Sequence, residues 1–357
     1  MKVAILIESM NKRGGTEIVA DNLCTAFKED GTECIILTLQ PYTGVNDCVV
    51  WLGSRPCQSV IKQWIIENQI TTIINFTHET IKLLRSKIPG VKRLAVFHWS
   101  VKGYEDSIMS LCEKKPSLLQ LIAKLKAKGN FNRIHKAMRR LDACVALTHE
   151  GEKELRSMGV KKTVVIPNFL PYTHKYNGFE KKRDNTMIYV GRLSSEKGVF
   201  LLLEIWEKII AQRPEMKLKI YGIGSERSAM NKIIADRNIP NVSFMGFVSD
   251  ATEIYQNAQV LLCPSETEGF GMVLLEAMYH GVVPVAFDCP VSPRELIGSA
   301  GFTVPCFDVN SFAHRALEII SDNELFATLQ KKGMMRAAQF YKPAVISKWN
   351  RLIEKNT

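Results

Sequence analysis

The sequence contains no apolar run long enough to cross a membrane. A transmembrane helix needs about 18 consecutive apolar residues, and none occurs among the 357 residues. The apolar run at residues 3–7 is too short for the core of a signal peptide, and Glu8 ends it. This run therefore predicts a first β-strand, and we expect the protein in the cytoplasm.

Several familiar site motifs are also missing. Nine cysteines occur, but no two form a C-x-x-C pair, so the spacing typical of a cysteine metal site is absent. Free thiols without an export signal are typical of a reducing compartment. There is no G-x-G-x-x-G, which excludes the usual dinucleotide fingerprint.

The excess of basic residues is concentrated in one segment. The chain has 47 Lys and Arg against 36 Asp and Glu, a formal net charge of +11. Residues 1–180 hold 26 basic and 17 acidic residues, residues 181–357 hold 21 and 19, and residues 112–140 alone hold nine and one. This distribution excludes a uniformly basic nucleic-acid-binding surface and indicates a local anionic partner.

Short β-branched segments alternate with helical segments along the chain, and a polar stretch at residues 171–186 divides them into two sets. Such alternation predicts parallel sheets covered on both faces. We expect an α/β protein with two doubly wound, Rossmann-like domains facing a cleft, at residues 1–175 and 176–340. The expected strands are Val3–Glu8, Cys34–Leu39, Thr72–Phe76, Leu94–His98, Cys144–Thr148, Thr163–Pro167, Met187–Val190, Lys217–Tyr221, Val242–Gly246, Val260–Cys263 and Val283–Phe287.

Glycine-containing turns follow two of these strands. Gly14 and Gly15 precede a helix, where backbone can approach a ligand closely and the helix N-terminus favours anions. A plain tight turn is the alternative. The strand Met187–Val190 leads into Gly191-Arg192-Leu193-Ser194-Ser195-Glu196-Lys197-Gly198. Ligands bind at the carboxyl ends of parallel strands, so Arg192 and Lys197 suit a diphosphate there, with a solvated capping loop as the alternative.

A third loop carries two glutamates eight residues apart, Glu268 and Glu276, around Gly269-Phe270-Gly271. Other glutamate pairs in the chain share this spacing, so the context decides. A strand ends before the loop and an apolar helix follows it. We therefore expect Glu268 in the loop and Glu276 about one turn into the helix, both facing the strand-end cleft. Carboxylates accept hydrogen bonds from sugar hydroxyls, while glycine N–H groups and a helix dipole suit phosphate.

The ordered set of motifs resembles the retaining glycosyltransferases of family four, which have the GT-B fold. The resemblance covers nearly the whole chain. It rests on Gly14-Gly15-Thr16-Glu17, Val145-Ala146-Leu147-Thr148, Pro167-Asn168, Gly191-Arg192-Leu193, Glu196-Lys197-Gly198 and the E-x7-E from Glu268 to Glu276. It implies an acceptor-binding domain at residues 1–175 and a nucleotide-sugar-binding domain at residues 176–340. It also implies a C-terminal helix, residues 341–357, that crosses back to the first domain. One departure is Val291-Ser292-Pro293-Arg294-Glu295, where related enzymes often carry Gly-Pro before the acid.

The resemblance also implies residue roles. Arg192 and Lys197 would neutralise the leaving nucleotide diphosphate, Glu276 would bind the donor ribose, and Glu268 would hold hydroxyls of the transferred sugar. His98 matches a family position near the donor sugar and the acceptor, although a lone histidine at a strand end is often structural. The implied donor-binding residues are Gly14, Gly15, Arg192, Lys197, Glu268, Gly269, Phe270, Gly271 and Glu276, with His98, Arg192, Lys197 and Glu268 catalytic. The implied base pocket lies near residues 222–224 and 246–248.

The sequence has no D-x-D, in agreement with a GT-B enzyme that needs no metal. No cofactor is expected, because the nucleotide sugar is a substrate.

Residues 117–140 combine apolar residues at helical spacing with many cations. A basic amphipathic helix suits an anionic membrane interface, where each cation contributes about 1 kcal/mol. An ordinary domain helix is the alternative, and RNA binding is disfavoured because aromatic residues are not interleaved. The expected membrane-docking residues are Lys124, Lys126, Lys128, Arg133, Lys136, Arg139 and Arg140.

Together with these observations, the resemblance implies a bacterial-type retaining glycosyltransferase at the inner face of the cell membrane. It would move a hexose or N-acetylhexosamine from a UDP-sugar to a glycan or lipid-linked acceptor, in polysaccharide or lipopolysaccharide biosynthesis. Same-face displacement and a covalent intermediate both stay open. One alternative is a GT-B sugar-nucleotide epimerase, which would need further acid–base groups. The other is a non-catalytic membrane- or RNA-binding scaffold with a relict fold, against which Arg192, Lys197, Glu268 and Glu276 argue.

Overall fold

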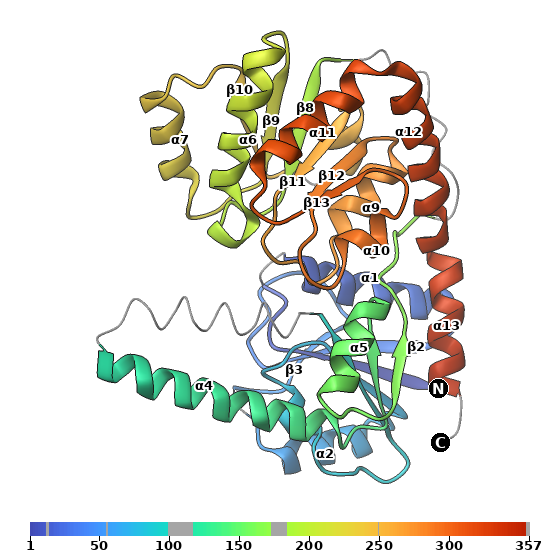
Figure 1. The fold of residues 1–357 in the computed structure, drawn as a ribbon. Coiled ribbons are helices and arrows are strands. Elements are labelled where there is room, and N and C mark those ends of the chain that lie inside the picture. Colours follow the sequence, from blue (N-terminus) through green and yellow to red (C-terminus); the bar gives the residue numbers. More distant parts are fainter. Residues whose placement is uncertain (12–13, 55, 99–116, 173–183, 249, 355–357) are drawn as a thin grey trace. The chain divides into compact units, whose positions relative to one another are not determined.

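The computed structural model describes residues 1–11, 14–54, 56–98, 117–172, 184–248 and 250–354, with backbone only for residues 117–127. The chain divides into two compact units (Figure 1). Unit 1 comprises Met1–Pro171 and Lys342–Thr357, and unit 2 comprises Tyr172–Tyr341. Both units are parallel α/β structures, which confirms the expected fold class.

Unit 1 is built on a parallel sheet with the strand order β3-β2-β1-β4-β5-β6-β7. Residues 3–7 of β1 are almost completely buried, as expected for a central strand with helices on both faces of its sheet. The strands are β1 (Lys2–Ile7), β2 (Glu33–Thr38), β3 (Val49–Trp51), β4 (Thr72–Asn75), β5 (Lys92–Phe97), β6 (Ala143–Ala146) and β7 (Thr163–Val165).

The helices of unit 1 include one from the far end of the chain. They are α1 (Gly15–Glu29), α2 (Gln58–Glu67), the 3-10 helix η1 (Ile81–Leu84), α4 (Ser117–Met138), α5 (His149–Ser157) and α13 (Lys342–Glu354). Helix α13 packs against α1, where the rings of Phe27 and Trp349 meet edge to face with centroids 6.2 Å apart. Nζ of Lys92 also donates to the carbonyl of Leu352 at 2.8 Å. The last described helix therefore belongs to the core of unit 1.

Unit 2 has a parallel sheet with the order β10-β9-β8-β11-β12-β13. Its strands are β8 (Thr186–Val190), β9 (Lys217–Tyr221), β10 (Val242–Gly246), β11 (Val260–Cys263), β12 (Val283–Phe287) and β13 (Phe302–Val304). Its helices are η2 (Ser195–Lys197), α6 (Val199–Gln212), α7 (Arg227–Asp236), α8 (Ala251–Tyr255), α9 (Met272–Tyr279), α10 (Pro293–Ile297), α11 (Val309–Ser321), α12 (Asn323–Ala337) and η3 (Ala338–Phe340).

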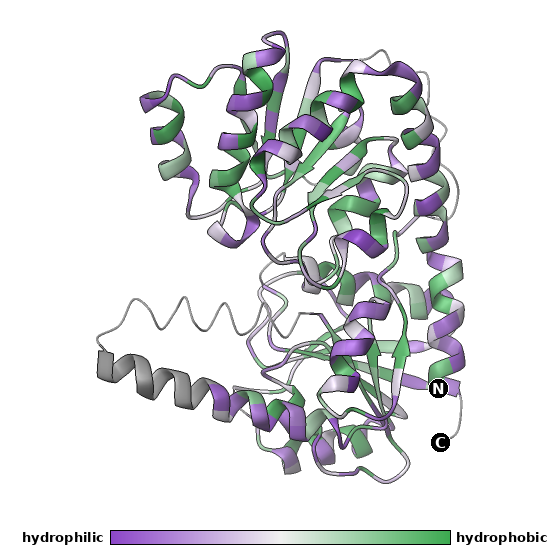
Figure 2. Ribbon diagram, viewed as in Figure 1, coloured by the Kyte–Doolittle hydropathy of each residue, from purple (hydrophilic) through white to green (hydrophobic). Residues whose placement is uncertain are grey.

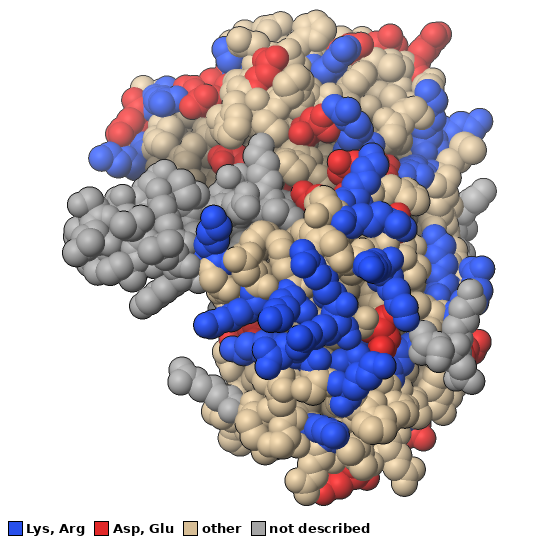
Figure 3. Space-filling view, turned by 60° about the horizontal axis from the view of Figure 1, so that its bottom comes forward, with Lys and Arg blue, Asp and Glu red and all other residues tan. Residues whose placement is uncertain are grey.

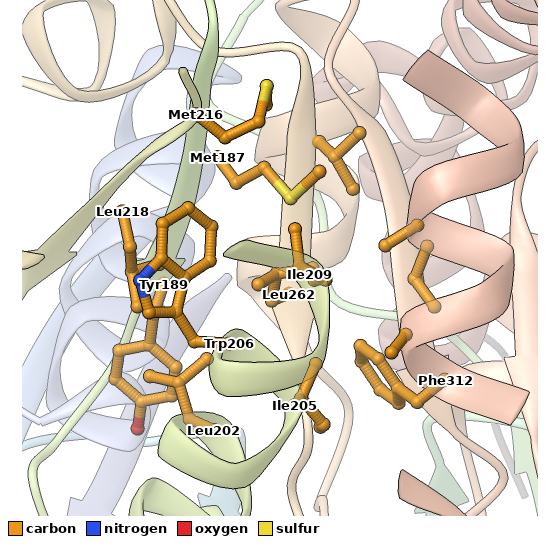
Figure 4. Packing of buried hydrophobic residues seen from close by; sticks show 14 of the residues in the cluster. Met187, Tyr189, Leu202, Ile205, Trp206, Ile209, Met216, Leu218, Leu262 and Phe312 are labelled. Atoms are coloured by element: carbon orange, nitrogen blue, oxygen red, sulfur yellow. The ribbon is translucent and has the colours of Figure 1, made fainter. Parts of the chain in front are cut away.

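Helix α6 fills the centre of the unit 2 core. Trp206 is fully buried, and its indole N–H donates to the carbonyl of Pro240 at 3.0 Å, so the one polar atom of the ring is satisfied. Met187 and Leu262 from neighbouring strands and Phe312 from α11 pack in the same cluster (Figure 4). Figure 2 shows the strands as mainly hydrophobic, while hydrophobic and hydrophilic residues alternate along many of the helices. This packed core holds the loops at the strand ends.

The sequence located most strands but not all of them. Strands β3 and β13 were not expected, since three residues give little periodic signal; β7 is equally short but lies in the longer expected strand Thr163–Pro167. The basic segment forms one continuous helix, α4, that runs through Gly129 and Asn130. A single glycine costs about 1 kcal/mol in a helix and does not end it.

Candidate active site

Two loops of unit 2 start from neighbouring strands at the point where the strand order reverses. Strands β8 and β11 pair side by side, with Val260 beside Met187. The strands after β8 are added on one side of this pair and the strands after β11 on the other side. Ligands of open α/β sheets bind outside the carboxyl ends of strands at this switch point. The loops after β8 and β11 carry the motifs that the sequence singled out.

The loops after β8 and β11 pack against each other at Gly198. This residue has φ +66°, and a Cβ atom built on it would lie 1.8 Å from the carbonyl oxygen of Pro264, so only glycine is compatible with the approach. The amide of Glu266 also donates to the carbonyl of Glu196 at 3.1 Å. The glycine that ends the Glu196-Lys197-Gly198 motif is therefore explained by packing of one loop on the other.

Arg192 is held at the surface of the site by an acid of its own loop. Its guanidinium lies 3.0 Å from Oε1 of Glu196, and its side chain is 68% exposed. The Ser194 hydroxyl donates to the same carboxylate at 2.8 Å. Burial acts to raise the pKa of Glu196, but the Ser194 hydroxyl, its own backbone amide, Arg192 and Lys197 together lower it. Glu196 is thus an ionised counter-ion for Arg192.

Lys197 and Glu268 form the inner ion pair of the site. Nζ of Lys197 lies 2.7 Å from Oε1 of Glu268, and the two side chains are 22% and 10% exposed. Burial alone would lower the pKa of Lys197, but the charge and hydrogen bond of Glu268 outweigh it and raise the pKa. The structure therefore joins the β8 and β11 loops through two of the predicted catalytic residues.

The Gly269-Phe270-Gly271 segment leads from Glu268 into α9. Gly271 has φ +89° and caps the N-terminus of the helix, so the first N–H groups of α9 start beside the β11 loop. Phe270 is buried, and its ring packs edge to face on Phe340, with centroids 6.2 Å apart. The side chain of Phe270 is thus part of the core, which leaves its backbone as the group that a ligand could contact.

Glu276 lies on the second turn of α9, as expected, and has a partner that the sequence did not predict. The Tyr255 hydroxyl donates to Oε2 of Glu276 at 3.0 Å. Burial raises the pKa of Glu276, and the Tyr255 hydrogen bond opposes this rise. Tyr255 lies on α8 and is 21 residues away in sequence, so no local pattern could have revealed the contact.

The segments expected to form a base pocket do lie together. The amide of Gly222 donates to the carbonyl of Gly246 at 2.7 Å, which joins the ends of β9 and β10. Ile223 and Phe247 leave these ends with side chains 65% and 54% exposed. Exposed apolar groups beside strand ends offer a surface for a planar ring.

Unit 1 contains the remaining predicted donor residues. Gly14 caps the N-terminus of α1, and a Cβ atom on Gly15 would have no described neighbour within 4 Å. His98 follows β5 directly. Its Nε2 is buried and has no hydrogen-bond partner among the described residues, and burial lowers its pKa to about 3. His98 is therefore neutral and 4.8 Å, centroid to centroid, from the ring of Phe76.

The basic segment exposes part of the predicted docking set. Ile134, Ala137 and Met138 of α4 are buried, while the described cations lie at the surface. The exposed cations are Lys128, Arg133, Lys136, Arg139 and Arg140. Lys124 and Lys126 lie in the part of α4 whose side chains are outside the described residues. Figure 3 shows Lys and Arg side chains gathered together on the surface of unit 1.

Arg139 also has a structural contact, because its Nε donates to the carbonyl of Met158 at 2.7 Å. No described helix is long and apolar enough to span a membrane. Within the described ranges, no group of three His, Cys, Asp or Glu side chains is placed to hold a metal ion.

Comparison with known proteins gives a consistent result. Residues 173–335 match the family described as glycosyl transferases group 1. An uncharacterized glycosyltransferase of Haemophilus influenzae is 23% identical, and the amylovoran biosynthesis glycosyltransferase AmsD of Erwinia amylovora is 24% identical. In both cases the similarity covers 99% of this chain and 99% of the relative.

Solved structures show the same fold. A mutant of S. aureus TarM, in complex with fondaparinux, α-GlcNAc-glycerol and UDP, has a TM-score of 0.77 at 13% identity, covering 99% of this chain and 100% of TarM. Anabaena HepE in complex with UDP has a TM-score of 0.78 at 17% identity, covering 99% of both chains. The family match over unit 2 and the full-length similarities support a glycosyltransferase with the GT-B fold.

Proposed function

We propose that the protein is a retaining, metal-independent glycosyltransferase of family four. It would transfer a hexose or N-acetylhexosamine from a UDP-sugar to a glycan or lipid-linked acceptor. The observation that carries the proposal is the meeting of Lys197 and Glu268, 2.7 Å apart, on adjacent loops at the switch point of unit 2. The ammonium group of Lys197 can bind a phosphate, and the carboxylate of Glu268 can accept hydrogen bonds from sugar hydroxyls. A nucleotide-diphosphate sugar offers both groups.

Each charged side chain of the candidate site has a role in this proposal. Arg192 and Lys197 neutralise the diphosphate as it leaves, and the N–H groups at the start of α9 add partial positive charge. Glu268 turns its carboxylate to the hydroxyls of the transferred sugar when Lys197 binds phosphate. Glu276 accepts from the ribose. Binding at several points holds the anomeric carbon in place, so much of the rate enhancement comes from positioning.

The choice of UDP is supported by the structural neighbours. TarM and HepE were solved with UDP, and AmsD is named for amylovoran biosynthesis. Ile223 and Phe247 would receive the uracil ring beside the ends of β9 and β10. His98 and Gly15 would contact the donor sugar from unit 1.

Calorimetric titration with UDP, GDP and their sugar derivatives tests the donor assignment. We expect UDP binding, and Arg192→Ala should weaken it at least about tenfold, since hydrogen bonds to charged groups contribute about 1.5–3 kcal/mol. Arg237→Ala is the matched control, because it removes another exposed arginine of unit 2 that pairs with an acid, Glu207, at 3.1 Å. Absence of binding by any nucleotide sugar, or an inverted anomeric centre in the product by NMR, would contradict the proposal.

We further propose that the cations of α4 bring the enzyme to an anionic membrane surface in the cytoplasm, where lipid-linked acceptors are available. Replacing Lys124, Lys126 and Lys128 by alanine should abolish cosedimentation with anionic vesicles, because each cation near such a surface contributes about 1 kcal/mol. Lys331→Ala with Lys332→Ala is the control, since both are exposed on α12 of unit 2. Undiminished cosedimentation of the triple variant would remove this part of the proposal.

A further inference from the structure

Tyr255 is a buried tyrosine whose hydroxyl donates to the carboxylate of Glu276. The distance from the hydroxyl to Oε2 is 3.0 Å, and the tyrosine has no exposed surface. Among the described residues, this is the one side-chain hydrogen bond that Glu276 receives. Its other oxygen, Oε1, stays available as an acceptor.

The surroundings of Tyr255 fix the direction from which this bond comes. Its ring stacks on His280, with centroids 5.4 Å apart and planes 11° from parallel. His280 is the C-cap of α9, four residues after Glu276, so the acceptor and the stacking partner come from one helix and the residue that ends it. The stack therefore holds the hydroxyl oxygen beside Glu276, whose Oε2 at 3.0 Å is a nearer acceptor than the Val273 carbonyl at 3.5 Å.

A carboxylate on a helix has several rotamers, and binding a ribose requires one of them. Fixing a side chain of this length in one rotamer costs up to about 2 kcal/mol of conformational entropy. A bond to Oε2 that exists before the ligand arrives removes part of this cost from binding. It also favours the ionised form, because a donor to a carboxylate stabilises its charge.

We propose that Tyr255 is a positioning residue that sets the preference of the site for ribonucleotides. It holds Oε2 of Glu276 so that Oε1 accepts from the hydroxyls of the ribose. This inference rests on the proposed role of Glu276 in donor binding. A purely structural tyrosine would instead support the binding of every nucleotide to the same extent.

Titration with UDP and with its 2′,3′-dideoxy analogue separates these possibilities. Tyr255→Phe keeps the ring and its stack on His280 and removes only the hydroxyl. We expect the variant to bind UDP about tenfold more weakly, while its affinity for the dideoxy analogue stays that of the unmodified protein. An equal loss for both nucleotides, or no loss for either, would overturn the inference.

Two further proteins complete the experiment. Tyr221→Phe is the matched control, because Tyr221 is another buried tyrosine of unit 2, on β9, and does not donate to Glu276. It should keep full discrimination between the two nucleotides. Glu276→Ala tests the underlying assignment, since it should abolish discrimination. If Glu276→Ala still discriminates between the two nucleotides, the ribose role of Glu276 is wrong. If Glu276→Ala loses the discrimination but Tyr255→Phe keeps it, only the role of Tyr255 is wrong.

If Tyr255→Phe does not fold, the inference can be tested with 3-fluorotyrosine incorporated at position 255. This analogue has nearly the shape of tyrosine and a more acidic hydroxyl, hence a stronger hydrogen-bond donor. We expect it to increase the discrimination between UDP and the dideoxy analogue. A folded protein with unchanged discrimination would overturn the inference.

Discussion

Replacement of Lys197 by methionine tests how strongly the inner ion pair contributes to stability. Nζ of Lys197 lies 2.7 Å from Oε1 of Glu268, and the side chains are 22% and 10% exposed. Methionine keeps most of the side-chain volume but leaves the Glu268 carboxylate without its cation. Breaking a buried pair in this way costs about 3–5 kcal/mol. Because Lys197 retains some contact with water, we expect a loss of about 3 kcal/mol in the free energy of unfolding.

The double variant distinguishes a coupled pair from two separate effects. Replacing a buried pair as a whole by neutral groups is often nearly neutral. Lys197→Met with Glu268→Gln should therefore lie within about 1 kcal/mol of the unmodified protein, with a large coupling energy in the cycle. Urea dependence of hydrogen exchange in peptides covering β11 and α9 gives the stability of unit 2, which need not unfold together with unit 1.

Two outcomes would refute this account of the ion pair. A loss below about 1 kcal/mol for Lys197→Met would place the pair in the range of exposed pairs. Strict additivity in the double variant would mean that the two charges do not interact. Arg213→Met is the control, because Arg213 and Glu215 are 2.8 Å apart but 36% and 43% exposed, so its loss should be small. Activity should vanish in every Lys197 variant, even in the double variant that regains stability.

Three other predictions follow from single groups. In thermal unfolding, Gly198→Ala should destabilise unit 2 by more than Gly246→Ala. Both glycines have positive φ, but only the Cβ added at position 198 meets backbone, 1.8 Å from the Pro264 oxygen. Equal losses of stability would contradict the packing argument. Burial raises the pKa of Glu276 above its ordinary value of 4.5, so its contribution to stability is full below pH 4.5 and is lost as the pH rises through the folded pKa. Glu276→Gln should accordingly raise the Tm at pH 7 and not at pH 4, and a difference independent of pH would speak against it. Burial lowers the pKa of His98 to about 3, so its NMR signals should report a neutral ring at pH 5, and a transition near pH 6.5 would refute this.

The sequence predicted the fold well because its signals were local. Buried strands such as β1 and β11 are continuous apolar runs, and glycine-rich turns follow the strands that carry the site. The reversal of strand order between β8 and β11 was not readable, since no local pattern encodes which strands pair. Yet this reversal is what brings the loop of Lys197 next to the loop of Glu268.

The sequence could name the residues of the candidate site but not the contacts between them. The motifs gave Arg192, Lys197, Glu268 and Glu276, because residue type and order carry that information. Their partners depend on tertiary structure. Tyr255 is the clearest case, because it lies on a helix of five residues without any motif and meets Glu276 only in the folded structure.

The two cations of the site differ in how they can meet a diphosphate. Unit 2 is formed by the part of the chain that is nearly balanced in charge, so it has little long-range attraction for anions. Arg192 is 68% exposed, and an exposed pair such as Arg192 with Glu196 holds weakly, so this arginine can exchange its carboxylate for phosphate at small cost. Lys197 is largely buried against Glu268. It can exchange this carboxylate for phosphate only if Glu268 receives new hydrogen-bond donors. Sugar hydroxyls are such donors, so the proposed function makes the sugar itself the group that releases Lys197 to the phosphate.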